Sequence, residues 1–263
     1  PMTKADIDAT EAPLIDHLIE LRKRLIYCVL GFVGAFVVSF YFSSDILHAL
    51  VLPFKWGTGL PDIKLISIKL LGVFLVKLKI AFFGGLFITF PLIAIQLYRF
   101  VAPGLYANER SAFRPYLFAT PVFFLLGAAL VYFFLLPVAI QFFYALAAGT
   151  GGDGQSAIDL MPDIEAYLDF VMMLILAFGL CFQLPVILTL LGQIGIVNYD
   201  QLRSGRKFAI VGVFVVAAVL TPPDPISQIS MAVPLMGLYE VAVQAVRLIE
   251  ARRRRAAGKD VQA

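Results

Sequence analysis

Charged residues are scarce in this sequence. Asp, Glu, Lys and Arg make up 15% of the 263 residues, whereas hydrophobic residues make up 60% and the mean hydropathy is +0.89. A soluble domain usually carries about 25% charged residues and is less than half apolar. A soluble core of this size could not bury so much apolar surface, so the sequence predicts a protein whose solvent is the lipid bilayer.

Cysteine and histidine are also scarce, and the sequence lacks the motifs of common catalytic sites. Cys28 and Cys181 both lie in apolar runs and are typical of small core residues, so they predict neither a disulfide nor a metal site. His17 and His48 are isolated. There is no zinc-protease His pair and no Gly-x-Ser-x-Gly elbow, and the glycine-rich stretch 149–154 lacks the Lys-Ser/Thr of a phosphate-binding loop. We therefore expect no enzyme, no metal and no cofactor.

Six apolar runs predict six membrane-spanning helices. They cover residues 25–42, 80–98, 115–136, 167–191, 208–220 and 226–246. The fifth run has 13 residues, which is about 20 Å of helix against roughly 30 Å of hydrocarbon. The sixth contains Pro234. The sequence therefore predicts an all-α polytopic membrane protein with six transmembrane helices, of which the last two are short.

The last two runs allow two arrangements, because the segment 221–225 reads Thr-Pro-Pro-Asp-Pro, a turn that no helix crosses unbroken. The pair is either a re-entrant hairpin or two spanning helices that thin the local bilayer. Basic residues flank both outer ends, which favours the spanning pair.

The segments outside these runs indicate one membrane domain with two polar ends. Residues 1–13 are predicted to be a mobile polar tail, residues 14–246 a single six-span membrane domain and residues 247–263 a basic cytoplasmic tail. The segment 43–79 holds five lysines, and its second half, residues 65–79, mixes apolar residues and lysines in the manner of an interfacial helix.

The basic residues predict the orientation of the chain. Sixteen of the 21 Lys and Arg residues lie in residues 1–24, 99–114 and 192–207 and after residue 246; the other five, all lysines, lie in residues 43–79. Cytoplasmic loops carry the excess of basic residues, so both termini are predicted to be cytoplasmic. The run Arg252–Arg255 is predicted to contact anionic lipid headgroups, and we expect no nucleic-acid partner.

Two carboxylates on the predicted cytoplasmic side lie among basic residues. In the stretch 17–25, His-Leu-Ile-Glu-Leu-Arg-Lys-Arg-Leu, helical spacing places Glu20 three and four residues before Lys23 and Arg24. Glu109 precedes Arg110 in the loop after the second run. Such carboxylates are suited to bind a guanidinium of a partner, because Arg presents a planar fork to the two oxygens. The alternative is a pair of surface ion pairs, Glu20 with Arg24 and Glu109 with Arg110, which spacing alone favours.

Four separated motifs then resemble one family. The stretch 17–25 resembles the opening signature of the TatC family, the multispanning core of the twin-arginine protein translocase. Residues 100–110 resemble the first cytoplasmic loop of that family, residues 178–186 its fourth helix, and residues 218–228 with 234–240 its last turn and helix. The motifs occur in the family order.

The resemblance implies a receptor and scaffold that binds signal peptides with paired arginines at the cytoplasmic face of the bacterial inner membrane. Folded proteins would then cross by use of the proton gradient. Glu20 and Glu109 match the positions that hold the two arginines, and Arg22, Phe100 and Pro103 match their neighbours. The implied partners are single-span TatA- and TatB-type proteins along the fifth and sixth helices, with self-association as a further contact.

The resemblance also marks four polar positions near the membrane. Gln183 stands where the family often has Glu; it cannot titrate, so we expect a polar contact to a partner helix, with a hydrogen bond inside its own bundle as the alternative. Asp224 is expected to cap the sixth helix or to dock a partner, and Gln228 follows one turn later. Glu240 is expected to pair with a basic residue of the tail or to contact a partner.

A small-solute secondary transporter is the alternative function. Gln183 and the proline-broken last two runs motivate it. Such a transporter usually shows charges buried at mid-membrane and a repeat between its halves, and the sequence shows neither.

Overall fold

The computed structural model describes residues 4–59, 66, 71–101, 114–148, 163–220 and 225–260. Within these ranges the chain is helical, and one isolated backbone bridge joins Ile66 to Asp163. In chain order the helices are α1 (Lys4–Tyr41), α2 (Ser43–Thr58), α3 (Gly72–Val101), α4 (Arg114–Leu130), the π-helix η3 (Val131–Leu135), α5 (Leu136–Ala148), α6 (Ile164–Cys181), α7 (Leu184–Gln193), α8 (Tyr199–Leu220) and α9 (Pro225–Asp260).

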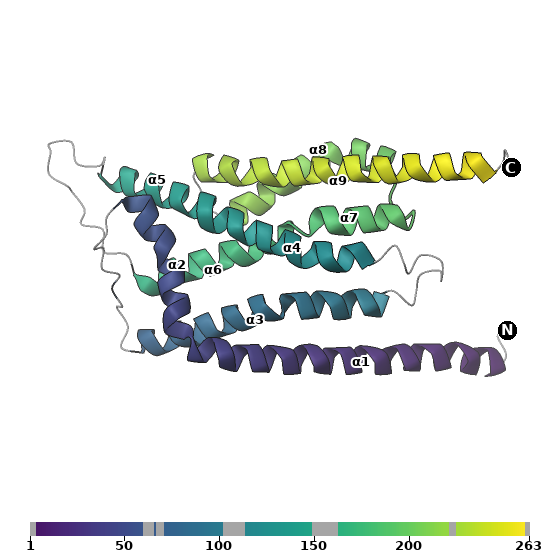
Figure 1. Ribbon diagram of the computed structural model, residues 1–263, viewed down its shortest axis with the longest axis horizontal. Coiled ribbons are helices and arrows are strands. Elements are labelled where there is room, and N and C mark those ends of the chain that lie inside the picture. Colours follow the sequence, from purple (N-terminus) through teal and green to yellow (C-terminus); the bar gives the residue numbers. More distant parts are fainter. Residues whose placement is uncertain are drawn as a thin grey trace.

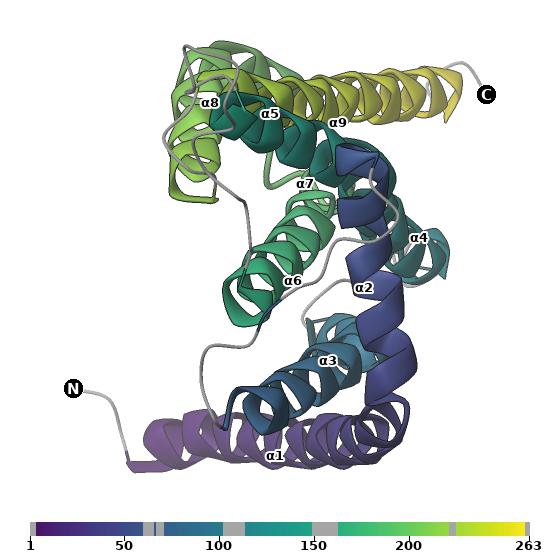
Figure 2. The ribbon, with the colours of Figure 1, turned by 90° about the vertical axis from the view of Figure 1, so that its left-hand side faces the viewer.

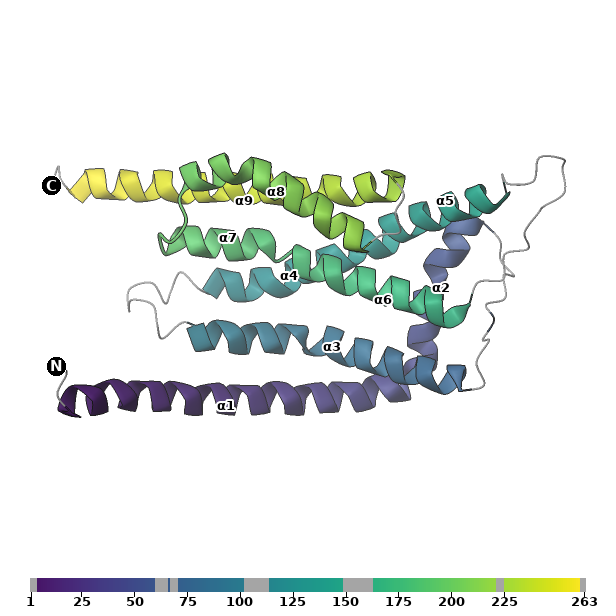
Figure 3. The same cartoon turned by 180° about the vertical axis from the view of Figure 1, so that it is seen from behind.

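Most of the helices run roughly along one direction, and α2 crosses the others steeply (Figure 1 and Figure 3). The start of α1 and the end of α9 lie at the same end of the bundle (Figure 1). Seen along the bundle, α1 and α3 lie at one edge, α8 and α9 lie at the other, and α6 lies between them (Figure 2). The motif at the start of the chain and the basic end of the chain therefore face the same side.

Five helical stretches in the described residues are long and apolar enough to cross a membrane. They are Leu18–Tyr41, Gly72–Phe100, Pro115–Leu146, Ile164–Gln193 and Gln228–Arg253. This confirms an all-α protein with several apolar spans. Helix α8 is not among the five, because Arg203, Arg206 and Lys207 precede its apolar part. The sixth span remains a prediction.

The prediction that the last span is short is wrong. Helix α9 has 36 residues and passes through Pro234, and 26 of its residues form the candidate span Gln228–Arg253. The apolar run ends at residue 246, but the Ala, Arg, Leu and Glu residues beyond it are good helix formers in water. The helix therefore continues where the hydropathy signal stops.

Two other predicted boundaries also change. Helix α3 begins at Gly72 and passes Lys77 and Lys79 without a break, so residues 72–79 are the first turns of a candidate spanning helix and do not form a separate helix. Residues 65 and 67–70 lie outside the described residues. Helix α1 begins at Lys4, so most of the predicted tail 1–13 is helical.

The fourth predicted run is interrupted between α6 and α7. The backbone N–H of Gln183 donates to the Leu180 carbonyl at 2.9 Å, which is an i→i−3 bond and makes a tighter turn than the α-helical i→i−4 bond. Pro185 follows at the start of α7 and has no N–H to donate. The proline thus accounts for the break.

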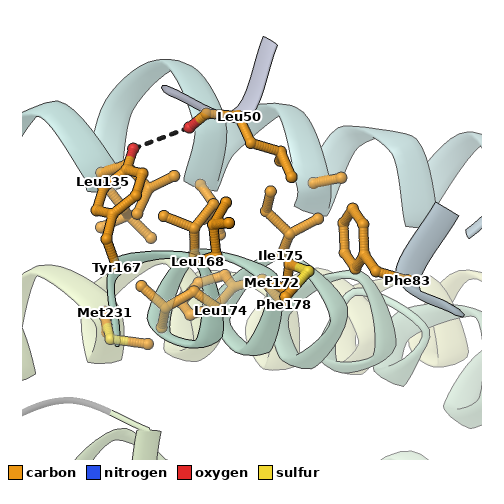
Figure 4. Packing of buried hydrophobic residues seen from close by; sticks show 14 of the residues in the cluster. Leu50, Phe83, Leu135, Tyr167, Leu168, Met172, Leu174, Ile175, Phe178 and Met231 are labelled. Carbon is orange, nitrogen blue, oxygen red and sulfur yellow. Dashed lines mark hydrogen bonds between the residues drawn. The ribbon is translucent and has the colours of Figure 1, made fainter. Parts of the chain in front are cut away.

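The core forms around α6, which contributes Leu168, Val171 and Phe178, all fully buried. Leu50 of α2 and Phe83 of α3 pack on it, and the Tyr167 hydroxyl donates to the Leu50 carbonyl at 2.8 Å (Figure 4). Helix association in a bilayer depends on close packing, because lipid tails are as apolar as leucine.

Two glycines allow this close packing. A Cβ on Gly127 of α4 would lie 2.7 Å from the Phe178 carbonyl oxygen of α6, and one on Gly85 of α3 would lie 3.0 Å from the Phe36 Cα of α1. At each of these glycines the backbones of the two packed helices are therefore in direct contact.

Candidate functional site

Glu20 lies near the middle of α1, beside the last turns of α3, and it binds a guanidinium there. Arg24 donates from Nε to Glu20 Oε1 at 3.0 Å and also from Nη2 to the same oxygen. Arg24 Nη1 donates to Gln96 Oε1 of α3 at 3.2 Å. The Glu20 side chain is 34% exposed and that of Arg24 is 19% exposed. The i,i+4 ion pair predicted from the spacing is therefore present.

Gln96 is a member of this cluster that sequence reasoning missed. It ties α1 to α3 through Arg24, and it lies one helical turn before Phe100. The sequence feature that could have indicated Gln96 is its amide side chain near the end of an otherwise apolar run. In the described residues both Arg24 contacts reach Oε1, so Glu20 Oε2 has no hydrogen-bond partner there.

The other residues of the predicted binding surface divide into two groups. Arg22 is exposed on α1, and Phe100 is half-buried near the end of α3. Pro103 and Glu109 lie outside the described residues. Within the described residues, the Arg24–Gln96 bond places this part of α1 beside the last turns of α3, one turn before Phe100.

Gln183 lies at the break between α6 and α7 and is 6% exposed. Its Nε2 donates to the Thr120 carbonyl of α4 at 3.0 Å and to the Gly179 carbonyl of α6 at 3.4 Å. The backbone N–H of Gln183 does not bond the Gly179 carbonyl, as it would in a regular α-helix, because it donates to the Leu180 carbonyl. The alternative prediction for this residue, a bond inside its own bundle, is therefore observed.

The Gln183 contact belongs to a small polar cluster. The Thr120 hydroxyl lies 3.0 Å from the Tyr98 hydroxyl of α3 and donates to the Tyr116 carbonyl at 2.9 Å. Gln183 Oε1 is buried and has no hydrogen-bond partner among the described residues. The N–H groups and the oxygen of a buried side-chain amide usually all have hydrogen-bond partners, so the Gln183 oxygen is an unused acceptor of this cluster.

The last two helices hold their polar residues against each other. Gln228 Nε2 of α9 donates to the Phe214 carbonyl of α8 at 3.3 Å. Arg206 Nη2 of α8 donates to Glu240 Oε1 at 2.7 Å, and Gln244 Nε2 reaches the same oxygen at 2.7 Å. The expected pairing of Glu240 with the tail is wrong, because the antiparallel α8 brings Arg206 beside it. Asp224 lies outside the described residues.

Within the described ranges no group of three or more His, Cys, Asp or Glu side chains could hold a metal ion. The chemistry that the cluster at Glu20 offers is charge-assisted hydrogen bonding to a guanidinium.

The fold and this cluster define a class: a helical membrane protein with several apolar spans and a carboxylate that binds a guanidinium where α1 packs on the last turns of α3. The model of the family described as "Sec-independent protein translocase protein (TatC)" matches residues 16–234, and the chain belongs to this family. It is a non-enzymatic transport family of membrane proteins, and its members are components of the twin-arginine translocase, which works with other Tat components. This replaces the solute-transporter alternative.

Named proteins of this family are similar to the chain over most of its length. A Sec-independent protein translocase protein TatC of Magnetococcus marinus is 42% identical over 243 residues, which cover 92% of this chain and 87% of the relative. The TatC protein of Escherichia coli is 37% identical over 232 residues, 88% and 86% of the two chains. The structure titled "Crystal Structure of Twin Arginine Translocase Receptor- TatC" superposes with a TM-score of 0.75 at 34% identity and covers 89% of this chain and 99% of its own.

Proposed function

We propose that this chain is the receptor and scaffold of a twin-arginine translocase, and that it binds signal peptides with paired arginines at the membrane face that carries both termini. Glu20 and Glu109 receive the two guanidinium groups, and Arg22, Phe100 and Pro103 line the same surface. The observation that carries this proposal is that Glu20 binds a guanidinium in the free chain, that of Arg24.

The cluster is suited to exchange one guanidinium for another. Glu20 is partly exposed, and its Oε2 has no partner among the described residues. Arg24 keeps Gln96 as a second acceptor when Glu20 turns to a peptide. An arginine of a signal peptide therefore meets a carboxylate that has already lost part of its water, and a neighbour that need not be left unpaired.

The membrane arrangement follows from the same proposal. Helix α8 is the sixth span, with about 20 Å of apolar length from residue 208 to residue 220. Both termini are cytoplasmic and the membrane is the bacterial inner membrane. The TatA- and TatB-type partners lie along α8 and α9 near Asp224 and Gln228, copies of the chain associate, and the proton gradient drives the passage of folded proteins.

The first test is the affinity of a fluorescent signal peptide with paired arginines for the purified full chain in nanodiscs. Glu20→Gln removes the charge but keeps the shape, and we expect about tenfold weaker binding or more, the scale of a hydrogen bond to a charged group. Asp200→Asn is the matched control, because Asp200 is an exposed acid near the start of α8. Equal affinity of Glu20→Gln and the control would move the site elsewhere.

A further inference from the structure

A hollow of about 440 Å³ lies between α3 and α6, apart from the cluster at Glu20. Its volume is typical of small-molecule sites, which measure roughly 300–1,000 Å³. The apolar lining comes from both helices: Leu78, Phe82 and Phe83 of α3, with Met172, Met173 and Leu176 of α6. The first residues of α3 and α6 lie at the end of the bundle away from the termini (Figure 1), so the hollow lies toward that membrane face.

One ion pair stands at this hollow and joins its two walls. Lys79 Nζ lies 2.8 Å from Asp169 Oδ1 and 2.8 Å from Oδ2. The side chains are 39% and 54% exposed, so both charges can be reached from outside. Lys79 lies about 10 Å along α3 and Asp169 about 8 Å along α6 from the first residue of each helix. Charges this near the helix ends are within reach of lipid headgroups, where their cost is small.

The hollow is open to the surroundings of the bundle. Leu78, Phe82 and Met173 in its lining are 40%, 55% and 47% exposed. The two methionines are flexible and polarisable side chains that fit irregular guests. In a bilayer, the guest that reaches such an opening is a lipid chain.

We propose that this hollow binds one phospholipid of the phosphatidylethanolamine class from the leaflet opposite the termini. An acyl chain fills the apolar part. The lipid phosphate accepts a hydrogen bond from the Lys79 ammonium, and the lipid ammonium donates to the Asp169 carboxylate. An ammonium has three donors and a carboxylate about four acceptor positions, so the two residues can bond each other and the lipid together.

Charge complementarity selects this headgroup. The zwitterionic headgroup carries a negative phosphate and a positive ammonium, and the Lys79–Asp169 pair carries one charge of each sign to bind them. A choline headgroup has no N–H to donate to Asp169, and a phosphatidylglycerol headgroup brings no cation to it. The proposal depends on the placement of α3 and α6 in a membrane and not on signal-peptide binding.

The experiment is native mass spectrometry of the full chain released from nanodiscs that contain equal amounts of phosphatidylethanolamine, phosphatidylcholine and phosphatidylglycerol. We expect the ethanolamine lipid to be retained about three- to tenfold over the other two, the scale of one hydrogen bond of typical net strength. Asp169→Asn should bring the ethanolamine-to-choline ratio close to one. Glu240→Gln removes an acid from a different ion pair of similar exposure, and it should leave the ratio unchanged.

A second variant tests the hollow apart from its charges. Met173→Trp adds bulk at an exposed lining position and leaves Lys79 and Asp169 in place, so it should lower retention of the ethanolamine lipid. Equal retention of the three lipids by the unmodified chain would mean general boundary lipid and would overturn the proposal. So would an unchanged ratio in Asp169→Asn, or a photo-crosslinker at residue 173 that captures a signal peptide in place of lipid.

Discussion

At the scale of single residues, the sequence separation of two partners decides whether their ion pair can be predicted. The Glu20–Arg24 pair is a local contact four residues apart, so spacing could predict it. The Lys79–Asp169 and Arg206–Glu240 pairs join residues 90 and 34 positions apart. Their partners depend on which helices lie side by side, which no local pattern contains.

Gln183 yields a prediction at this scale. Gln183→Leu leaves the Thr120 and Gly179 carbonyls without this donor, so the chain in detergent should lose about 0.6 to 2 kcal/mol of stability and melt at a lower temperature. Gln141→Leu is the control, because Gln141 is exposed on α5 and this chain should melt as the unmodified chain does.

The Glu variant at the same position separates donor loss from packing. In Gln183→Glu only the protonated acid can donate to the two carbonyls, so stability should be highest at low pH and fall as the acid ionises. A melting temperature that does not depend on pH in this variant, or a Gln183→Leu chain as stable as the unmodified one, would show that the side chain only packs.

At the scale of the helices, apolar runs predict where the spans lie but not where the helices end. The helix class and the position of five spans follow from hydropathy, because burial in lipid requires an apolar, internally hydrogen-bonded segment. Helix ends depend on propensity as well, and α9 continues past its apolar run for that reason. The break before α7 had a signal in Pro185, which a longer apolar run concealed.

Helix α8 carries the prediction at this scale. If it spans, a single cysteine placed in the turn 221–224 of a chain with Cys28→Ala and Cys181→Ala should react with a membrane-impermeant maleimide added outside intact cells. A single cysteine in the tail beyond residue 255 should react only after the membrane is opened. Labelling of the turn that also requires opened cells would contradict the spanning pair and favour the re-entrant hairpin.

At the scale of the whole molecule, two features lie at opposite ends of the same bundle. Glu20 lies beside the last turns of α3, because its partner Arg24 also bonds Gln96 there, whereas the α3–α6 hollow lies toward the first turns of α3 and α6, at the end of the bundle away from the termini (Figure 1). The ion pair of Glu20 could be predicted from the sequence, because its partner lies four residues away in one short stretch. The second could not be predicted, because a hollow is a property of how two helices separate.

The central claim is that the chain recognises paired arginines, and a comparison of two signal peptides tests it most directly. One carries the two arginines, and the other carries two lysines at the same positions. Lysine keeps the charge but loses the planar fork that bonds both oxygens of a carboxylate. We predict that the lysine peptide binds the full chain in nanodiscs about tenfold more weakly or worse, and equal dissociation constants for the two peptides would contradict the account.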